Sequence, residues 1–465
     1  MERALQENIH FMWLSAMQRP DHNTLNRFRS GVLKGVLGEV FSQVVLLLAE
    51  EGLLDLKSGY TDGTKIESVA NKYTFVWGKG IKTSKERIKK QLSELLDYAQ
   101  QMAEEELQDV SLETFQKVRA EKVAQTIEKI DSALADKPVA KKVKQKLNYA
   151  KKHWPDKLKE YQQKEEVLNG GNSYSKTDPD ATFMRMKDDH MGNGQLKAAY
   201  NWQQTTSGQF ILGYSLHQTT NDTTVLKDHL EVLEEQLGTL PKELCADAGY
   251  GSEENYKMLE EKQVEAYVKY SYFHKEESKK WREDPFRVQN LYYNPEQDCY
   301  YCPMGQAMIK LKEGQRKTAN GFVQHLTYYQ ARNCRGCPLR GMCHKSAGNR
   351  TIEVNHSLNA YRKQAKQRLT SERGLFHRSQ RPQEVEAVFG HIKSNRKFNR
   401  LMLKGLQKTE IEIGLLSLAH NLLKKCSKAW ENIQRQKASA YFQLEKITSK
   451  IVPPLANNLT PKVSI

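Results

Sequence analysis

Hydrophobic residues recur with two different spacings along the chain, and the changes between them divide it into segments. In residues 1–58 they recur mostly every three or four positions, as at Leu25, Phe28 and Val32, with basic residues between them. This spacing places apolar side chains on one face of a helix. It predicts a helical N-terminal domain over 1–58, either a plain helical subdomain or a DNA-binding helix pair.

After residue 58 the spacing of hydrophobic residues changes to the two-residue period of a strand. Tyr60, Asp62, Thr64 and Ile66 alternate with more polar positions, which predicts a strand, although Asp62-Gly63 is also a common hairpin-turn sequence. Further strand and helix patterns alternate up to residue 274, including a short apolar strand that ends at Asp247. Segments 59–79 and 169–274 are therefore expected to form an α/β core interrupted by insertions.

The first insertion is predicted over 80–168. This segment is charged and poor in glycine and proline, and its apolar residues (Ile88, Leu92, Leu95 and Leu96 among them) recur at helical steps. We expect two or three long amphipathic helices with a coiled-coil-like arrangement. Their many lysines are most simply a solvated face, and the alternative roles are DNA contact or dimerisation.

A second insertion, 275–375, is irregular in pattern and rich in aromatic residues. It holds two Cys-x-x-Cys steps about thirty residues apart, a spacing typical of the turns that hold tetrahedral zinc. Reduced free thiols and a redox pair are the alternatives. Because Cys299 makes five cysteines where four suffice, the ligand set is ambiguous. The first choice of zinc ligands is Cys302, Cys334, Cys337 and Cys343.

Segment 376–430 is expected to supply the closing helices of the core. One of them has an apolar face of Val385, Val388, Phe389 and Ile392, and Glu386 and Lys393 lie two turns apart on another side of that helix. Segment 431–465 is predicted to continue as a helix and then, from Ile451, as a disordered tail rich in proline and asparagine.

The charge of the chain points to a polyanionic partner. Its formal net charge is +16, and nucleic acid is the first candidate. An anionic membrane surface is the alternative, but the sequence has no basic amphipathic anchor, and no apolar run approaches the roughly 18 residues that span a bilayer. Without a signal-peptide pattern at Met1–Ala4, we expect a cytoplasmic protein that is not bound to a membrane.

Three carboxylates lie where an active site would be expected: Asp62 on the first strand, Asp247 at the end of a later strand, and Glu386 on a late helix. Phosphoryl transfer on DNA requires carboxylates that hold two divalent cations, and Mg²⁺ prefers such oxygen ligands. Lys393 could hold a backbone phosphate beside them. Asp178 and Asp180 compete with Asp62 for the first position, but Pro179 between them favours a turn over a central strand.

At these residues the sequence resembles the DDE transposases of bacterial insertion sequences. The resemblance covers about Asn8 to Lys425 and rests on motifs around the three carboxylates, on Tyr200–Gln203 and Asn221-Asp222, and on a closing helix. Relatives usually carry a longer N-terminal DNA-binding region, and some place a tyrosine before the glutamate where this chain has only Arg378 and Arg381. The matching segments are Thr61–Ile66, Ala246–Tyr250, Val385–Lys393 and Ala419–Leu422.

The resemblance implies an RNase H-like core, a mixed sheet flanked by helices, in which Asp62, Asp247 and Glu386 bind Mg²⁺ (or Mn²⁺). It also implies binding to terminal inverted repeats, cleavage and strand transfer, a homodimer on double-stranded DNA, and a place at the nucleoid. Arg396 and Arg400 join Lys393 as expected phosphate contacts. Two alternative hypotheses remain. The chain is a catalytically silent DNA-binding protein derived from a transposase, or it is a general metal-dependent nuclease without strand transfer.

Overall fold

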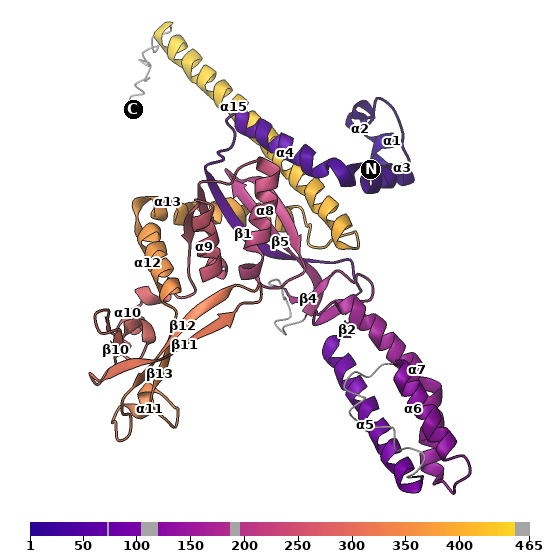
Figure 1. Ribbon diagram of the computed structural model, residues 1–465. Coiled ribbons are helices and arrows are strands. Elements are labelled where there is room, and N and C mark those ends of the chain that lie inside the picture. The colour runs from indigo at the N-terminus through magenta and orange to yellow at the C-terminus, as the bar shows by residue number, and fades with distance from the viewer. Residues whose placement is uncertain (72–73, 104–119, 187–195, 452–465) are drawn as a thin grey trace, which may run out of the picture.

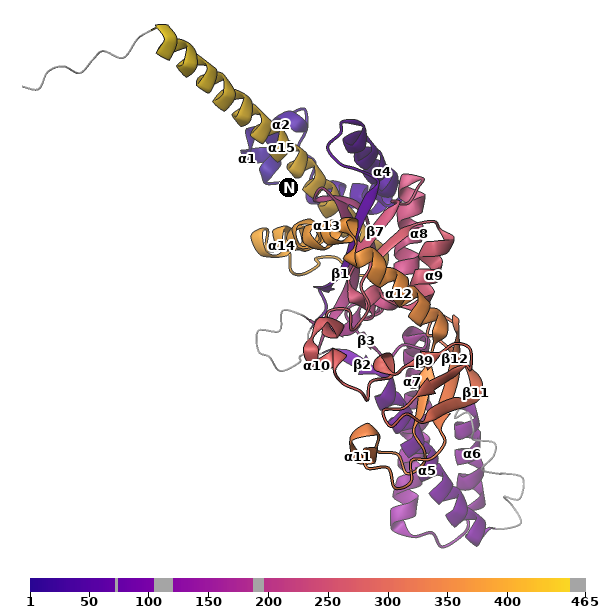
Figure 2. The ribbon, with the colours of Figure 1, turned by 90° about the vertical axis from the view of Figure 1, so that its left-hand side faces the viewer.

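The computed structural model describes residues 1–71, 74–103, 120–186 and 196–451, with side chains as far as 439. A mixed α/β body lies at the centre, and two units extend from it (Figure 1). One is a bundle of long helices and the other carries a second sheet. The last helix projects from the body in a third direction, which is clearest after a quarter turn (Figure 2).

The central sheet has six strands. Their order is β4-β5-β1-β7-β8, and β6 pairs with the second half of β5 beyond β4. β1 is antiparallel to β5 but parallel to β7, and β7 is parallel to β8. The strands are β1 (Ser58–Glu67), β4 (Thr182–Arg185), β5 (Leu196–Ser207), β6 (Phe210–His217), β7 (Glu243–Ala246) and β8 (Glu265–Val268).

Several predicted elements of the core are confirmed. The segment around Asp62 is one continuous strand, so Asp62-Gly63 is not a hairpin turn. The strand that ends at Asp247 is followed by α9, which begins where Ser252 caps it, since the Ser252 side chain accepts a hydrogen bond from the Asn255 amide. Residues 187–195 lie outside the described residues, and β5 begins directly after them.

Helices cover both faces of this sheet. On one face lie α8 (Leu226–Leu237) and α9 (Glu253–Glu261), and on the other lie α13 (Glu372–Gln380), α14 (Ala387–Gly390), α4 (Lys34–Glu50) and α15 (Leu406–Ile451). The side chains of Trp202, Tyr200, Phe41 and Phe210 are completely buried between these layers. Such burial on both faces explains why β5 and β6 carry few exposed residues.

The first insertion is helical, as predicted. It consists of α5 (Gly78–Met102), α6 (Ala120–Ala133) and α7 (Lys141–Leu168), whose apolar faces form a core of their own. A two-stranded sheet of β2 (Phe75–Trp77) and β3 (Ser173–Ser175) closes its base. The insertion therefore folds around contacts that the central sheet does not supply.

The second insertion is more regular than the sequence indicated. It contains a five-stranded antiparallel sheet, which the prediction of irregular structure missed. Of its two longest strands, β11 (Ala307–Lys317) carries charged side chains on both faces, and β12 (Val323–Ala331) mixes polar and aromatic side chains on both, so no alternating apolar pattern marks either strand. The strands beside them are β9 (Tyr293–Asn294), β10 (Cys299–Tyr301) and β13 (Thr351–Val354), and the short helices of this unit are α10 (Lys279–Arg282) and α11 (Arg340–Cys343).

The C-terminal part of that segment belongs to the core. Helix α12 (His356–Thr370) packs beside β8 and α9, and Ala365 and Leu369 are buried in the main core. At the other end of the chain, α15 runs as one helix to Ile451, in agreement with the helix predicted to continue beyond 430. The disordered tail predicted beyond Ile451 lies outside the described residues.

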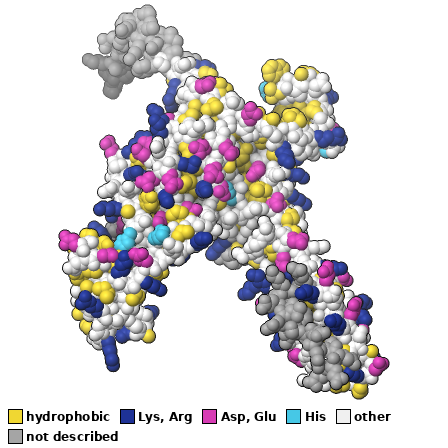
Figure 3. All heavy atoms as spheres, in the orientation of Figure 1, with side chains coloured by type: hydrophobic (Ala, Val, Ile, Leu, Met, Phe, Trp, Pro, Cys, Tyr) yellow, Lys and Arg dark blue, Asp and Glu magenta, His cyan; other side chains and the backbone are white. Residues whose placement is uncertain are grey.

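The N-terminal segment is helical, as predicted, with α1 (Ala4–Glu7), α2 (Ile9–Leu14) and α3 (His22–Arg27) before α4. By length and composition alone, His22–Glu50 could cross a membrane, which the count of apolar residues did not anticipate. Phe41 and Val45 within it are fully buried against the core, whereas 28% of its most apolar 18-residue stretch is buried. Hydrophobic side chains gather on the surface of the N-terminal helices, while charges of both signs are mixed elsewhere on the visible face (Figure 3).

Candidate active site

Two of the predicted site carboxylates lie beside each other because of strand register. β1 and β7 run parallel, with Thr61 paired to Ala246, so Asp62 and Asp247 occupy the next positions along the two strands. Asp247 leaves the strand because its Oδ1 accepts a hydrogen bond from the Gly249 amide at 2.9 Å, which starts a turn. Both side chains therefore stand near the carboxyl end of the parallel strands, where α/β proteins commonly place active-site groups.

Glu386 reaches the same place from the other end of the sequence. It ends a wide π-type turn over Pro382–Glu386, directly after α13. The buried side chains of Val385, Val388 and Ile392 hold this segment against the sheet, as the apolar pattern predicted. Burial of that face leaves Glu386 directed toward β1.

A single arginine joins the three carboxylates. Arg381 Nη2 lies 3.1 Å from Asp62 Oδ2 and 3.7 Å from Asp247 Oδ2, and Arg381 Nη1 lies 2.5 Å from Glu386 Oε1. The Arg381 side chain is 8% exposed, whereas those of Asp247 and Glu386 are 50% exposed. The three predicted residues are thus brought together around one buried guanidinium.

The electrostatics of this cluster favour a cation at its centre. Burial acts to lower the pKa of Arg381, but the charges of Asp62, Asp247 and Glu386 outweigh it and raise that pKa above its ordinary value. Three carboxylates facing one point also form a hard oxygen donor set of the kind that Mg²⁺ prefers.

The carboxylates are not arranged as a finished metal site. Within the part of the chain that the structure describes, no three His, Cys, Asp or Glu side chains are placed to hold an ion. The guanidinium of Arg381 lies among the three carboxylates that would form such a group. The donor set therefore fits a divalent cation in charge and chemistry, and Arg381 provides the positive charge in this arrangement.

A polar network supports the site from the opposite face of β1. Gln203 donates to Asp222 Oδ1 at 3.0 Å and accepts a hydrogen bond from the Tyr250 hydroxyl. Burial, together with the charges of Asp62, Asp222 and Asp247, raises the pKa of Tyr250 well above its usual value. This network connects β5, the loop before α8 and the turn after Asp247.

Gly63 makes room for that network. A methyl group at Gly63 would lie 2.1 Å from Gln203 Nε2 and 2.9 Å from Asp222 Oδ1. Gln203 and Asp222 stand out in the sequence only through the resemblance, which assigned them no role. Their partnership depends on strand pairing, so no local pattern could have predicted it.

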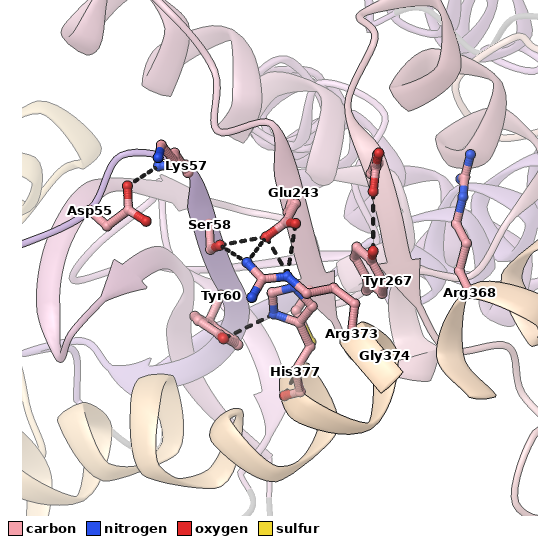
Figure 4. Close-up of polar contacts among 12 residues, drawn as sticks. Asp55, Lys57, Ser58, Tyr60, Glu243, Tyr267, Arg368, Arg373, Gly374 and His377 are labelled. Carbon is pink, nitrogen blue, oxygen red and sulfur yellow. Dashed lines mark hydrogen bonds and ion pairs between the residues drawn. The ribbon is translucent and has the colours of Figure 1, made fainter. Parts of the chain in front are cut away.

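A second buried cluster fixes the helix that carries Arg381. His377 on α13 lies between Tyr60 and Glu243, the latter at the start of β7 (Figure 4). Arg373, one turn earlier on α13, donates to both Glu243 oxygens. These hydrogen bonds, led by those from Arg373, lower the pKa of Glu243 to about 2, and burial lowers the pKa of His377. No local sequence pattern predicted this cluster, because its members come from distant segments of the chain.

The predicted phosphate contacts have different surroundings. Lys393 donates to Thr64 Oγ1 at 2.7 Å and to the Lys65 carbonyl at 2.8 Å, and it lines a cleft of about 480 Å³. Arg400 donates to the carbonyls of Ser68 and Ala70. Arg396 is exposed. As folded here, Lys393 and Arg400 therefore fasten the segment after Glu386 to the end of β1.

The competing carboxylates have structural partners. Asp178 is fully buried and accepts hydrogen bonds from Tyr200, Ser68 and the Gly405 amide. Asp180 accepts one from the Leu406 amide at the start of α15. Both residues hold the beginning of α15, and neither contacts Arg381.

The predicted zinc ligands also come together. Cys302, Cys334, Cys337 and Cys343 line one cavity of about 20 Å³, whereas Cys299 does not. All seven cysteines are free thiols. Among the described residues, no three of these side chains are already placed to hold an ion.

A family model of known proteins matches part of the chain. Residues 301–426 match the model of a family described as a transposase DDE domain, and this supports a DDE transposase. The matched part contains Glu386, Arg381 and the four cysteines, while Asp62 and Asp247 precede it. No curated protein matches the chain.

Proposed function

We propose that this chain, which carries a transposase DDE domain, is the transposase of a bacterial insertion sequence. It would bind the terminal inverted repeats of its element, cleave the DNA there with water and join the freed 3′-hydroxyl to target DNA. The observation that carries the proposal is the convergence of Asp62, Asp247 and Glu386 on one buried guanidinium.

The strand order supports an RNase H-like core for this reaction. The central sheet combines an antiparallel pair, β5 and β6, with three strands that are mutually parallel, β1, β7 and β8. In this order the chain places two carboxylates on adjacent parallel strands and the third on a helix across them. The two insertions then extend from the core without interrupting the paired strands.

Asp62, Asp247 and Glu386 would hold two divalent cations, Mg²⁺ or Mn²⁺. When bound, these ions supply activation of the attacking oxygen and stabilisation of the leaving oxygen. Arg381 keeps the three carboxylates together, so the donor set is assembled before the ions enter. The network of Gln203, Asp222 and Tyr250 holds the turn after Asp247 in place.

The partner is double-stranded DNA, which the net charge of +16 supports. Lys393, Arg396 and Arg400 are proposed contacts to DNA phosphates. Arg396 needs the least rearrangement because it is exposed, whereas Lys393 and Arg400 would release hydrogen bonds to the end of β1 and the residues after it. Because a transposase must hold two DNA ends, we propose a homodimer. Its action on bacterial DNA places it in the cytoplasm, at the nucleoid.

The test is Mg²⁺-dependent cleavage of a labelled duplex that carries the element's own ends, with wild type beside Asp247→Asn. Asp228→Asn, on the exposed side of α8, is the matched control. We expect cleavage by the wild type and the control and its loss in Asp247→Asn. Binding to the ends without cleavage by any of them would instead identify a catalytically silent DNA-binding protein. Cleavage without joining of pre-cut ends would indicate a nuclease.

A further inference from the structure

The distal end of the second insertion gathers four thiols from three separate turns. Cys302 follows β10, Cys334 and Cys337 follow β12, and Cys343 ends α11. All four line the same small cavity. They belong to the unit that carries α11, which extends from the central body (Figure 1). Residues up to 41 positions apart in the sequence are therefore brought to one point by the pairing of β10, β11 and β12.

The backbone around these cysteines has the form of tight turns that present sulfur. The Gly305 amide donates to the Cys302 carbonyl at 2.8 Å, and the Cys337 amide donates to the Cys334 carbonyl at 3.4 Å. Each turn contains a glycine with positive φ, +76° at Gly305 and +71° at Gly336. The site thus combines one Cys-x-x-Cys turn, Cys334–Cys337, with a second tight turn that begins at Cys302, and turns of this kind are typical of zinc-binding sites.

Two of the sulfurs already accept hydrogen bonds from a buried cationic residue. The Arg350 amide donates to Cys334 Sγ at 3.3 Å, and Arg350 Nη1 donates to Cys343 Sγ at 3.0 Å. The guanidinium is itself held by the Phe286 carbonyl. Donors directed at sulfur stabilise thiolates, the form in which cysteine binds metal.

An imidazole lines the same cavity. His344 Nδ1 is 2.7 Å from Ser346 Oγ, while His344 Nε2 is buried and has no hydrogen-bond partner. A buried polar atom without a partner is unusual and marks a place where a ligand can be accepted. Either His344 or Cys343 could complete a set with the other three cysteines, and the contacts from Arg350 favour Cys343.

We propose that Cys302, Cys334, Cys337 and Cys343 bind one structural Zn²⁺, with Arg350 as the charged group that supports two of the sulfurs. Binding replaces four thiol protons, which pass to solvent, and leaves a site of charge −2 that Arg350 partly offsets. Because the sulfurs are not yet at ligand positions, their side chains must turn inward as the ion enters. This inference is independent of the proposed DNA chemistry.

Zinc would stabilise a unit with little core of its own. The buried cluster beneath this sheet has eight residues, and the loop from 332 to 350 has one four-residue helix. Small units of this kind commonly need a metal or another cross-link to stay folded. The ion would tie the turn after β10 to the loop after β12.

The test measures metal in the purified full-length chain. We expect one zinc per chain by elemental analysis, retained in Cys299→Ser and His344→Ala and lost in Cys334→Ser. In the wild type stripped of metal, added Co²⁺ should give the intense visible absorption of tetrahedral thiolate coordination, a readout that does not depend on any variant folding.

Three results would overturn the proposal. Wild-type protein that binds neither zinc nor Co²⁺ would show that the cysteines are only reduced thiols. Zinc retained in Cys334→Ser would remove that sulfur from the site. Zinc lost in His344→Ala but retained in Cys343→Ser would replace the four-thiol set with three cysteines and a histidine.

Discussion

The guanidinium of Arg381 lies 3.1 Å from the Asp62 carboxylate, although 319 residues separate them in the sequence. The same guanidinium contacts Asp247 and Glu386, so the residues proposed to bind metal are already held together by a cation of the protein. This arrangement separates the assembly of the carboxylates from the arrival of metal. Substitutions at Arg381 and at the residues that support the site test whether Arg381 holds the carboxylates together.

Replacing Arg381 by alanine should make folding depend on metal. Loss of one partner of a fully buried ion pair costs about 3–5 kcal/mol, and half-exposed partners here reduce this to about 1–3 kcal/mol. Added Mn²⁺ should then raise the melting temperature of Arg381→Ala more than that of the wild type, because it binds the folded carboxylates.

The matched control is Arg378→Ala, one turn away on α13, whose ion pair with Glu277 spans 4.0 Å and has an exposed partner. Its response to Mn²⁺ should equal that of the wild type. If Arg381→Ala unfolds at the wild-type temperature with and without metal, Arg381 does not hold the carboxylates together.

Gly63→Ala should disturb the network behind the site. The added methyl group would overlap Gln203 and press on Asp222, and overpacking of this kind costs about 1–3 kcal/mol. DNA cleavage should fall further than DNA binding, because the turn after Asp247 shifts while the exposed basic residues stay.

Urea unfolding would measure the loss of stability, and cleavage and binding assays would compare the two activities on DNA. Gly80→Ala on α5 is the control, since its methyl group would meet only Trp77 Cβ at 4.0 Å. Equal stability and equal DNA cleavage in Gly63→Ala and Gly80→Ala would mean that the close packing at Gly63 supports neither the fold nor the site.

Acid should weaken the attachment of α13 in two steps. The pKa of His377 is lowered by burial, so the unfolded chain takes up a proton first, and stability falls as pH drops through about 6.5, its ordinary value. The pKa of Glu243 is lowered to about 2, so its contribution is present above its ordinary value and is lost as pH falls from there toward 2.

Glu243→Gln should remove the second step and cost about 1–3 kcal/mol at pH 7, the value of hydrogen bonds to a charged group. Glu265→Gln, its exposed cross-strand neighbour on β8, should keep the second step, because the hydrogen bonds from Arg373 to Glu243 remain. Urea unfolding between pH 7 and pH 3 gives both comparisons. Identical profiles of stability against pH for wild type and Glu243→Gln would contradict the assignment of the second step to Glu243.

Deleting residues 80–168 should leave the central body folded. The helical insertion is buried mainly against itself, and its ends are close, with the Gly78 amide donating to the Asn172 carbonyl at 2.9 Å. A short flexible link can therefore replace it. We expect DNA affinity to fall by about tenfold or more, because several lysine–phosphate contacts are lost.

Thermal unfolding would show whether the deletion protein is folded. Fluorescence anisotropy with a DNA end would measure its DNA affinity, and sedimentation its mass in solution. The salt dependence of binding should also become shallower as phosphate contacts are removed. A deletion protein with wild-type affinity and wild-type mass in solution would exclude both DNA contact and dimerisation as roles of the insertion.

Local sequence patterns determined many of the secondary-structure elements of this protein and which of their faces are buried. Alternation around Asp62 predicted a strand, the turn after Asp247 predicted a strand end, and the apolar face of Val385 and Ile392 predicted the burial that orients Glu386. These features are set by the preferences of neighbouring residues, which a single sequence contains. The residue types then limited the chemistry to carboxylates suited to divalent metal.

Only the tertiary structure decided which side chains meet. Arg381 lies among the three carboxylates, Lys393 is fastened to Thr64, and Asp178 holds the start of α15 because of pairings between distant strands and helices. The second sheet was hidden for a related reason, since β11 is polar on both faces and has no local period. Contacts between distant segments depend on register and packing of the whole chain, which no short stretch of sequence encodes.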